Sequence, residues 1–379
     1  MHIRIDDRHG AGDVHVVSDE ILPAERLTRR TKGELASDVA SRLAPAALAT
    51  RGDDGVLRCT ACAHRCAFAG DREGACGVRH ARGGRLFAPR GFIARRYVRD
   101  VETNTVYHVE PGAKALTFGL YGCDLRCPYC HNWRLSQALR EDVPGEHPID
   151  VTADELADEA VRSGCRVMCA AYNEPMIAAE WVREVFAAAR ARGLRTLVVS
   201  DGHTTPEALT YLRPVTDAFR VDLKGSTPEQ YRTLGGRLEP VLEGIQTARA
   251  LGYWIEVVTL VVPGFNDDEA GLRRLAKTLA SIDPDMPWHL NAFQHRYKLR
   301  DRAPCPPDRL VSLAGAGYAR GLRFVYVGNV TRVFPELEHT RCPGCHSVLV
   351  ERSGWRTTRS RLTSHGGCPD CGVTIPGLF

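Results

Sequence analysis

The sequence predicts an α/β fold built around a partial (β/α)6 barrel of the TIM type. From Lys114 onward, short runs rich in β-branched residues alternate with segments of helical periodicity. Such a series produces a parallel sheet with helical crossovers, either an open doubly wound sheet or a barrel. About six repeats are fewer than the eight of a closed barrel, which favours the partial barrel.

The strands and helices of this region follow from composition and boundary residues. The expected strands are 114–119, 166–172, 195–200, 218–223, 254–262, 287–293 and 323–328. The expected helices include 154–163, 178–193, 239–252 and 268–282. Thr152 and Glu155 have the spacing of a capping box, and Gly193 and Gly252 are typical residues at helix ends.

Four regions are predicted along the chain. Residues 1–58 form an N-terminal extension, in which an Ala- and Leu-rich stretch predicts a helix broken at Pro45. Residues 59–113 form a Cys-rich module with a connecting arm. The barrel occupies residues 114–335, and residues 336–379 form a module of the zinc-ribbon or rubredoxin type.

Composition excludes several classes of protein. The 379 residues are 44% hydrophobic and 25% charged, which is typical of folded soluble chains and not of disordered or collagen-like ones. We find no apolar stretch long enough to span a membrane and no signal-peptide pattern at the start, so we expect a cytoplasmic protein. A formal charge of +4 is too balanced to indicate a nucleic-acid partner.

Cysteine usage is unusual, with 14 cysteines in a chain that lacks an export signal. Disulfides are rare in the reducing cytosol, and eleven of the cysteines have metal-ligand spacings. These eleven are Cys59, Cys62, Cys66, Cys76, Cys123, Cys127, Cys130, Cys342, Cys345, Cys368 and Cys371. The remaining three, Cys165, Cys169 and Cys305, are expected to be buried as small apolar side chains.

The strongest signal is a CxxxCxxC motif at Cys123, Cys127 and Cys130, directly after the first expected barrel strand. Three crowded thiolates suit one side of a [4Fe–4S] cluster and would leave its fourth iron open to a small ligand. Structural zinc usually takes four ligands in CxxC pairs, so this motif fits zinc poorly.

This motif, with Tyr129 before its last cysteine, resembles that of the radical S-adenosylmethionine (SAM) superfamily. Gly122, YNEP at 172–175, VDLKG at 221–225 and VVPGFND at 261–267 extend the resemblance to the branch of pyruvate formate-lyase activating enzymes. The N-terminal cysteine set, the PWHLNAFQHRYKLRDRAP segment and the C-terminal CPGC and CPDC pairs are similar to the radical SAM member of the AmmeMemoRadiSam system. The resemblance covers roughly residues 57–379.

The resemblance implies a reaction. A reduced [4Fe–4S] cluster on Cys123, Cys127 and Cys130 would bind SAM and cleave it to methionine and a 5′-deoxyadenosyl radical. That radical would abstract hydrogen from a substrate, while the protein positions the reactants and excludes water. We assign no catalytic residue beyond the cofactor ligands. An electron donor such as a flavodoxin or a ferredoxin is the expected partner, together with a protein substrate.

The resemblance also suggests SAM contacts at the strand ends. Glu174 stands where the family's GGE-type motif contacts the methionyl amine, and Asn173 replaces a glycine common in that motif. Ser200 and Asp201 end the next strand, and an acid at 201 favours contact with the ribose over the methionyl carboxylate.

Further contacts are expected nearby. Asp222 and Lys224 share one face of their strand end. Only five of the 50 basic residues are lysines, which makes Lys224 a candidate ligand for the SAM carboxylate or a substrate, against a surface role. His289 is a candidate lining residue against the alternative of a hydrogen-bonded core histidine. Tyr129 is expected to pack beside the cluster.

The two flanking cysteine sets leave their metals open. Cys342, Cys345, Cys368 and Cys371 form two CxxC pairs typical of a tetrathiolate site, for which zinc is favoured over a redox iron. Cys59, Cys62, Cys66 and Cys76 have a less standard spacing that suits zinc or an auxiliary iron–sulfur cluster equally.

Three functions compete. The leading hypothesis is an activase that generates a glycyl radical in a partner enzyme, and the second is radical modification of another protein or a small molecule. The third is a non-enzymatic iron–sulfur or zinc module acting on nucleic acid. Near-neutral charge and SAM-type residues at several strand ends argue against the third.

Overall fold

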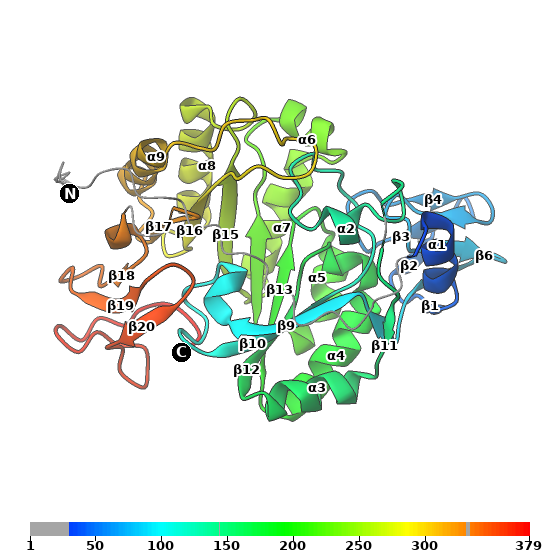
Figure 1. Cartoon of the computed structure of the whole chain (residues 1–379), viewed down its shortest axis with the longest axis horizontal. Helices are drawn as coiled ribbons and strands as arrows, with labels where there is room; N and C mark the ends of the chain where they lie inside the picture. The colour runs from blue at the N-terminus through cyan, green and yellow to red at the C-terminus, as the bar shows by residue number, and fades with distance from the viewer. Residues whose placement is uncertain (1–29, 144, 331–333) are drawn as a thin grey trace.

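The computed structural model describes residues 30–143, 145–330 and 334–379. Its centre is an eight-stranded sheet of order β17-β16-β15-β14-β13-β12-β10-β9 (Figure 1). The strands are β9 (Arg95–Asp100), β10 (Lys114–Gly119), β12 (Cys165–Ala170), β13 (Arg195–Ser200), β14 (Ala218–Asp222), β15 (Trp254–Val261), β16 (Trp288–Ala292) and β17 (Val325–Gly328). Neighbours from β10 to β17 are parallel and β9 is antiparallel to β10, so every predicted strand is present.

Helices connect consecutive parallel strands and give six βα units followed by a seventh strand. They are α3 (Ala153–Arg162), α4 (Ala179–Ala191), α5 (Pro206–Leu212), α6 (Pro228–Leu234), α7 (Leu238–Ala250), α8 (Glu269–Ile282) and α9 (Pro307–Ala319). The capping box of Thr152 and Glu155 is formed at the start of α3. Helices α5 and α6 are seven residues long and were not predicted, because so short a segment shows little periodicity.

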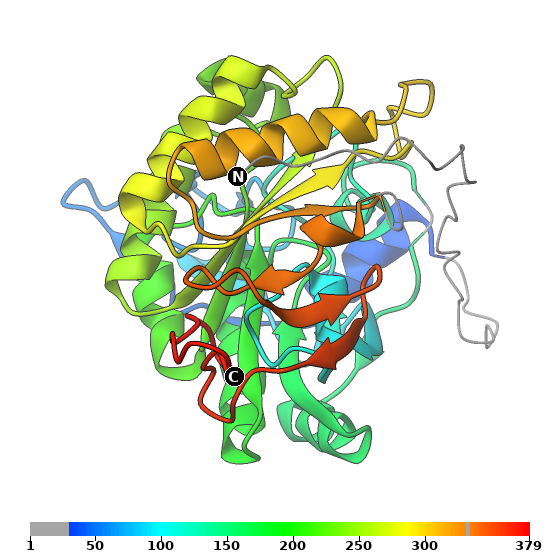
Figure 2. The same ribbon diagram turned by 90° about the vertical axis from the view of Figure 1, so that its left-hand side faces the viewer.

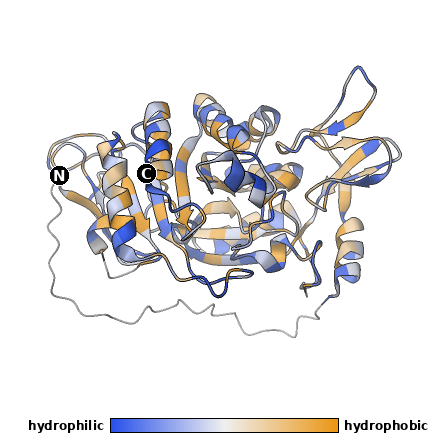
Figure 3. Cartoon of the chain, turned by 90° about the horizontal axis from the view of Figure 1, so that it is seen from above, coloured by the Kyte–Doolittle hydropathy of each residue, from blue (hydrophilic) through white to orange (hydrophobic). Residues whose placement is uncertain are grey.

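Alternate residues of each strand face opposite sides of the sheet. Met168 and Val198 belong to the large core that also contains residues of α3 and α4. Cys169 and Leu197 face the other, concave side, where Val101 and Val106 cover them. Figure 3 shows hydrophobic residues recurring along the strands and the helices. Cys165, Cys169 and Cys305 are buried in this framework, as the sequence predicted.

The N-terminal module starts earlier than residue 59. Helix α1 (Lys32–Ala40) ends well before Pro45, and Leu43–Pro45 instead forms β1, which pairs with β7. The predicted helix is therefore confirmed as far as Ala40 and wrong beyond it, because Leu43–Pro45 is used in a sheet. The small strands of the module are β2 (Ala49–Arg51), β3 (Leu57–Cys59), β4 (Ala67–Phe68), β5 (Arg72–Glu73), β6 (His80–Arg82) and β7 (Arg85–Pro89). They form two sheets, and a boundary at residue 58 cuts through one of them.

Short elements complete the connection to the barrel. They are β8 (Phe92–Ile93), paired with β11 (Ile149–Asp150), and the helices η1 (Val101–Asn104) and α2 (Trp133–Ser136). Helix α2 directly follows the CxxxCxxC segment.

The C-terminal module lies near the β17 edge of the central sheet (Figure 2). Its sheet contains β18 (Thr340–Arg341), β19 (Val348–Arg352) and β20 (Thr357–Ser360). The buried Arg352 guanidinium donates to the backbone oxygen of Tyr107 at 2.8 Å and lies 4.0 Å from the centre of the Tyr107 ring. These contacts fix the module to the segment between β9 and β10, at the opposite edge of the sheet.

Among the described residues, the helices are too short or too polar to cross a membrane.

Candidate functional site

Three thiols lie in the loop between β10 and α2, at the carboxyl ends of the barrel strands. Cys127 is buried, and Cys123 and Cys130 are half-buried. The hydroxyl of Ser136 lies 3.3 Å from the Cys130 sulfur. Among the described residues, this trio does not gather its sulfur atoms within 4.8 Å of one another, so its spacing does not match a single tetrahedral ion. Three thiols at wider spacing suit a cluster face, and the residues present fit a [4Fe–4S] group.

The start of this loop is held by the turn after β12. The Asn173 side chain accepts from the Leu120 amide at 3.0 Å and donates to the Gly122 carbonyl oxygen at 3.0 Å. The left-handed residue of the turn is Tyr172, with φ of 73°, and not Asn173. Asn173 therefore contributes its amide group to the loop rather than an unusual backbone conformation.

Glu174 links the ends of β12 and β13. Its carboxylate accepts from the Ser200 hydroxyl at 2.9 Å, the Asp201 amide at 2.7 Å and the Met176 amide at 2.9 Å. Burial, followed by the charge of Asp124, raises the pKa of Glu174 to about 7. The structure thus places Glu174, Ser200 and Asp201 together, and much of the hydrogen-bonding capacity of Glu174 is used within the protein.

A buried acidic pair adjoins Cys123. The Cys123 sulfur lies 3.9 Å from an Asp124 oxygen and 4.0 Å from an Asp201 oxygen. Burial and the neighbouring charges of Asp124 and Glu174 raise the pKa of Asp201 well above its usual value. Burial also acts to raise the pKa of Asp124, but His203, at 2.9 Å, holds it below the usual value. Asp201 therefore borders the thiol loop, where it favours the protonated form.

A buried cation also lies near the thiol loop. The Lys224 ammonium lies 3.0 Å from Asp222, which also pairs with Arg220 at 2.8 Å. Burial opposes the charge of Lys224, but Asp222 and the Cys127 thiol raise its pKa well above the usual value. Tyr129 packs against Phe265, and its buried hydroxyl has no partner among the described atoms. An unpartnered hydroxyl beside a cation is suited to meeting a bound ligand.

His289 makes a different set of contacts. Its Nε2 lies 2.7 Å from Glu256, and its ring packs against Tyr107 and Tyr326. Glu256 also accepts from the backbone amides of Tyr107 and His108, both at 2.9 Å. The structure therefore shows His289 as a hydrogen-bonded core histidine, which was the alternative reading, in a group that fixes the segment before β10.

Several residues around the thiols were not predicted as site residues. His203 and His64 both contact Asp124, and their ring centres lie 4.8 Å apart. Arg140 donates to the Cys123 carbonyl oxygen. Asp124 could have been selected from its place between two cysteines of the motif, and His203 from its position just after a predicted strand. Arg140 and His64 have no such signal, because only the folded chain brings them to the loop.

The C-terminal cysteines form a compact group. Sulfur atoms of Cys342 and Cys371 lie 3.5 Å apart, and those of Cys345 and Cys368 lie 3.6 Å apart. All four sulfur atoms lie within 4.8 Å of one another. Zinc–sulfur bonds of about 2.3 Å in a tetrahedron place sulfur atoms roughly 3.8 Å apart, so the spacing fits one bound ion.

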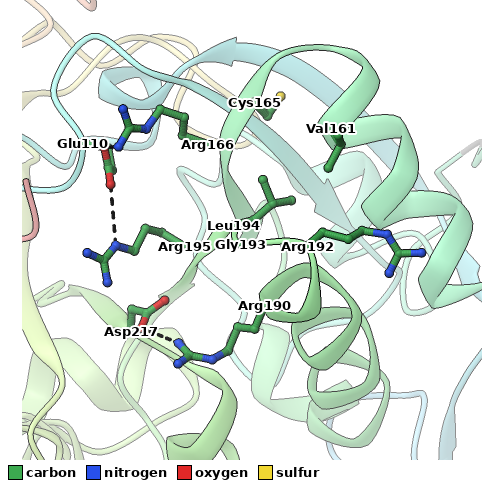
Figure 4. A pocket seen from close by; sticks show the side chains of 10 residues that line it. All are labelled: Glu110, Val161, Cys165, Arg166, Arg190, Arg192, Gly193, Leu194, Arg195 and Asp217. Carbon is green, nitrogen blue, oxygen red and sulfur yellow. Dashed lines mark hydrogen bonds and ion pairs between the residues drawn. The ribbon is translucent and has the colours of Figure 1, made fainter.

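A separate pocket of about 510 Å³ lies at the amino ends of β12 and β13, at the other end of the sheet (Figure 4). Its arginines are ion-paired: Glu110 lies 2.8 Å from Arg166 and 3.5 Å from Arg195, and Asp217 pairs with Arg190. The positive charge of this pocket is thus largely compensated, and its residues are distinct from those around the thiols.

Comparison with known proteins identifies the family. Residues 119–276, which include the CxxxCxxC loop and the strands β12 to β15, match the family model of the radical SAM superfamily. The chain belongs to the radical SAM superfamily. It is 31% identical over 302 residues to an uncharacterized protein of Methanocaldococcus jannaschii, covering 79% of this chain and 89% of that one.

The chain is also similar to proteins whose names state an activity. The pyruvate formate-lyase-activating enzyme of Staphylococcus epidermidis is 28% identical over 194 residues, covering 46% of this chain and 71% of the relative. A solved domain of a pyruvate-formate lyase-activating enzyme from Bacteroides vulgatus aligns with a TM-score of 0.38 at 16% identity, covering 42% of this chain and 97% of that domain. QueE from Escherichia coli aligns with a TM-score of 0.41 at 14% identity, covering 63% of this chain and 93% of QueE. The chain is thus a radical SAM protein similar to pyruvate formate-lyase-activating enzymes.

Proposed function

We propose that this radical SAM enzyme holds a [4Fe–4S] cluster on Cys123, Cys127 and Cys130 and reductively cleaves SAM. The observation that carries the proposal is the position of three thiols of one loop at the carboxyl ends of the strands, among buried acids and one buried lysine. When bound there, the cluster and SAM would supply a 5′-deoxyadenosyl radical for hydrogen abstraction from a substrate.

The charges around the thiols favour one orientation of an amino-acid ligand. Cys123 lies in the field of Asp124, Asp201 and Glu174, whereas Lys224 has the largest charge effect on Cys127, ahead of the smaller effects of Asp201 and Asp222. An ammonium group is attracted to the acidic side and a carboxylate to the lysine side. The methionyl part of SAM carries both groups, so it would bind with its amine toward Cys123 and its carboxylate toward Lys224.

This arrangement modifies two expectations for individual residues. Glu174 would act on the SAM amine through its charge, since its oxygen atoms already accept hydrogen bonds from Ser200 and two backbone amides. Asp201 lies 4.0 Å from the Cys123 sulfur, and in its protonated form it would accept a hydrogen bond from the amine through its carbonyl oxygen, in place of the ribose role expected from the sequence.

The substrate we propose is a glycine residue of a partner protein, oxidised to a glycyl radical. The similarity to pyruvate formate-lyase-activating enzymes supports this class. Radical modification of another protein or of a small molecule is the second candidate, supported by the two additional cysteine modules. An external one-electron donor such as a flavodoxin or a ferredoxin would reduce the enzyme in either case.

For the C-terminal module we propose structural zinc at Cys342, Cys345, Cys368 and Cys371. Its compact sulfur spacing suits a single ion, and the Arg352 contacts give the module a role in closing the fold. Rubredoxin-like iron is the alternative, which metal analysis of the protein distinguishes.

The test of SAM cleavage uses anaerobically reconstituted protein. After reduction with dithionite and addition of SAM, chromatography with mass detection should find 5′-deoxyadenosine. Cys127→Ala should reduce the product to the enzyme-free background, whereas Cys169→Ala, at a buried cysteine outside the metal sets, should retain it. Equal product from wild type and Cys127→Ala would overturn the assignment.

A further inference from the structure

The N-terminal cysteines gather in one place although they span 18 positions of sequence. The backbone amide of Cys59 donates to the carbonyl oxygen of Cys66 at 3.0 Å, which places both residues at the loop end of the β3–β4 hairpin. The Ala75 amide lies 3.3 Å from the Cys66 sulfur, so the turn containing Cys76 closes over the hairpin. Cys62 lies within electrostatic range of both Cys59 and Cys76. The fold therefore collects all four thiols.

Their spacing differs from that of a single-ion site. The sulfur atoms of the four C-terminal cysteines all lie within 4.8 Å of one another. Among the described residues, no three of the N-terminal sulfur atoms form such a group, which concerns Cys59, Cys62, Cys66 and Cys76. A tetrahedral zinc ion needs sulfur atoms roughly 3.8 Å apart. Iron–sulfur clusters bind their four thiolates through different iron atoms, so they accept wider spacing.

A buried ion pair and backbone amides surround these thiols, and burial raises the pKa of Cys59, Cys62 and Cys76. Arg79 is buried, donates to Glu180 through two bonds of 2.8 Å, and lies in the field of Cys59 and Cys76. Backbone amides donate toward the thiols, as the Ala75 amide does to Cys66. Amide–sulfur hydrogen bonds and nearby charge are the features by which proteins stabilise and tune iron–sulfur clusters.

The N-terminal thiols lie directly against the CxxxCxxC loop. A Cβ atom added at Gly122 would meet the Cys76 carbonyl oxygen at 2.7 Å, so the two ligand loops are in backbone contact. Arg140 donates to the carbonyl oxygens of both Ala75 and Cys123. His64, two residues after Cys62, lies 3.1 Å from the Asp124 carbonyl oxygen.

We propose that Cys59, Cys62, Cys66 and Cys76 hold an auxiliary iron–sulfur cluster that passes electrons to the cluster site at Cys123, Cys127 and Cys130. The relay role rests on the proposed function, whereas the cluster itself does not. A low-potential one-electron carrier gives one electron to the auxiliary cluster, which then reduces the neighbouring cluster by one electron. No proton or covalent bond changes in this transfer. The half-buried Cys66 is the thiol nearest to solvent and marks the side of electron entry.

The test of the cluster removes the other iron site. The triple variant Cys123→Ala, Cys127→Ala, Cys130→Ala is reconstituted anaerobically and analysed for iron, sulfide and zinc. We expect about two or about four iron atoms with equal sulfide, the contents of a four-cysteine cluster, and an EPR signal after reduction that SAM leaves unchanged. Less than about 0.5 iron per chain, with zinc at two per chain, would overturn the proposal.

The test of the relay uses Cys66→Ser in the otherwise intact chain. Wild type should take up about two electrons per chain in an anaerobic dithionite titration, and Cys66→Ser about one. The variant should form 5′-deoxyadenosine with dithionite but lose at least tenfold in rate with reduced flavodoxin. Equal rates with flavodoxin for both proteins would contradict the relay. If wild type forms no 5′-deoxyadenosine, the result contradicts the proposed function and not the auxiliary cluster. The iron content of the triple variant then still tests the auxiliary cluster.

Discussion

The two flanking modules each offer four cysteines, but the structure arranges them in different ways. The C-terminal sulfur atoms are compact, with Cys345 and Cys371 exposed. The N-terminal sulfur atoms are more widely spaced, with only Cys66 short of full burial. The N-terminal set contacts the CxxxCxxC loop, whereas the C-terminal set belongs to a sheet near the β17 edge. On our proposals, the same ligand chemistry serves a structural ion in the C-terminal module and a redox group in the N-terminal module.

The largest expected effect separates the two modules by metal. Cys342→Ala with Cys345→Ala should abolish zinc binding and unfold residues 336–379, because structural zinc contributes about 10–16 kcal/mol in small modules. Limited proteolysis should then cleave this region, while the iron content stays at the wild-type value. Loss of iron together with zinc would show that the two modules are not independent.

The second effect concerns how the N-terminal module is attached. Arg79→Leu leaves Glu180 buried without its partner, and breaking such a pair costs about 3–5 kcal/mol. Urea unfolding of the anaerobic protein measures the loss. Arg90→Leu is the matched control, because its pair with Glu184 is exposed and contributes about 0–1 kcal/mol. Equal destabilisation by both variants would show that the buried pair has no special role.

A third prediction tests the charged side of the SAM site. Lys224→Met should raise the KM for SAM by roughly 10- to 100-fold, because a buried cation facing the ligand carboxylate is lost. Arg220 still pairs with Asp222 at 2.8 Å, so the fold should persist. Lys298→Met removes an exposed ammonium paired with Glu141 and should leave the KM unchanged. An unchanged KM in Lys224→Met would remove this lysine from the SAM site.

The smallest effect is a pH dependence confined to the C-terminal module. Burial raises the pKa of Glu338 to about 7. The folded state then binds a proton more tightly than the unfolded state, so this carboxyl group lowers the free energy of unfolding as the pH rises from about 4.5 to about 7. In wild type this carboxyl group should lower the free energy of unfolding by on the order of 1 kcal/mol across this pH range, and Glu338→Gln should abolish that decrease. Urea unfolding at several pH values measures the difference. An identical pH profile in the variant would contradict the assigned protonation.

The barrel and its thiol loop could be predicted because their signals are local. Strand composition, helix caps and the spacing of Cys123, Cys127 and Cys130 lie within short windows of sequence. Glu174 and Lys224 could also be placed, since strand ends of a parallel sheet meet at one edge.

Other features depend on contacts between distant segments. The β1 pairing of Leu43–Pro45 competes with local helix propensity and is decided by β7. His289 has the same appearance in sequence whether it meets a ligand or Glu256. The contact between Cys76 and Gly122 that joins the two ligand loops has no signal in either loop alone.

The most direct test of this account is the metal and sulfide content of the full chain, purified and reconstituted anaerobically. One four-iron cluster, an auxiliary cluster of two or four iron atoms and one zinc ion predict about six or about eight iron, an equal amount of sulfide and about one zinc per chain. A content of about four iron and two zinc would assign zinc to the N-terminal cysteines and contradict the auxiliary cluster. Absence of iron and sulfide would contradict the radical SAM site itself.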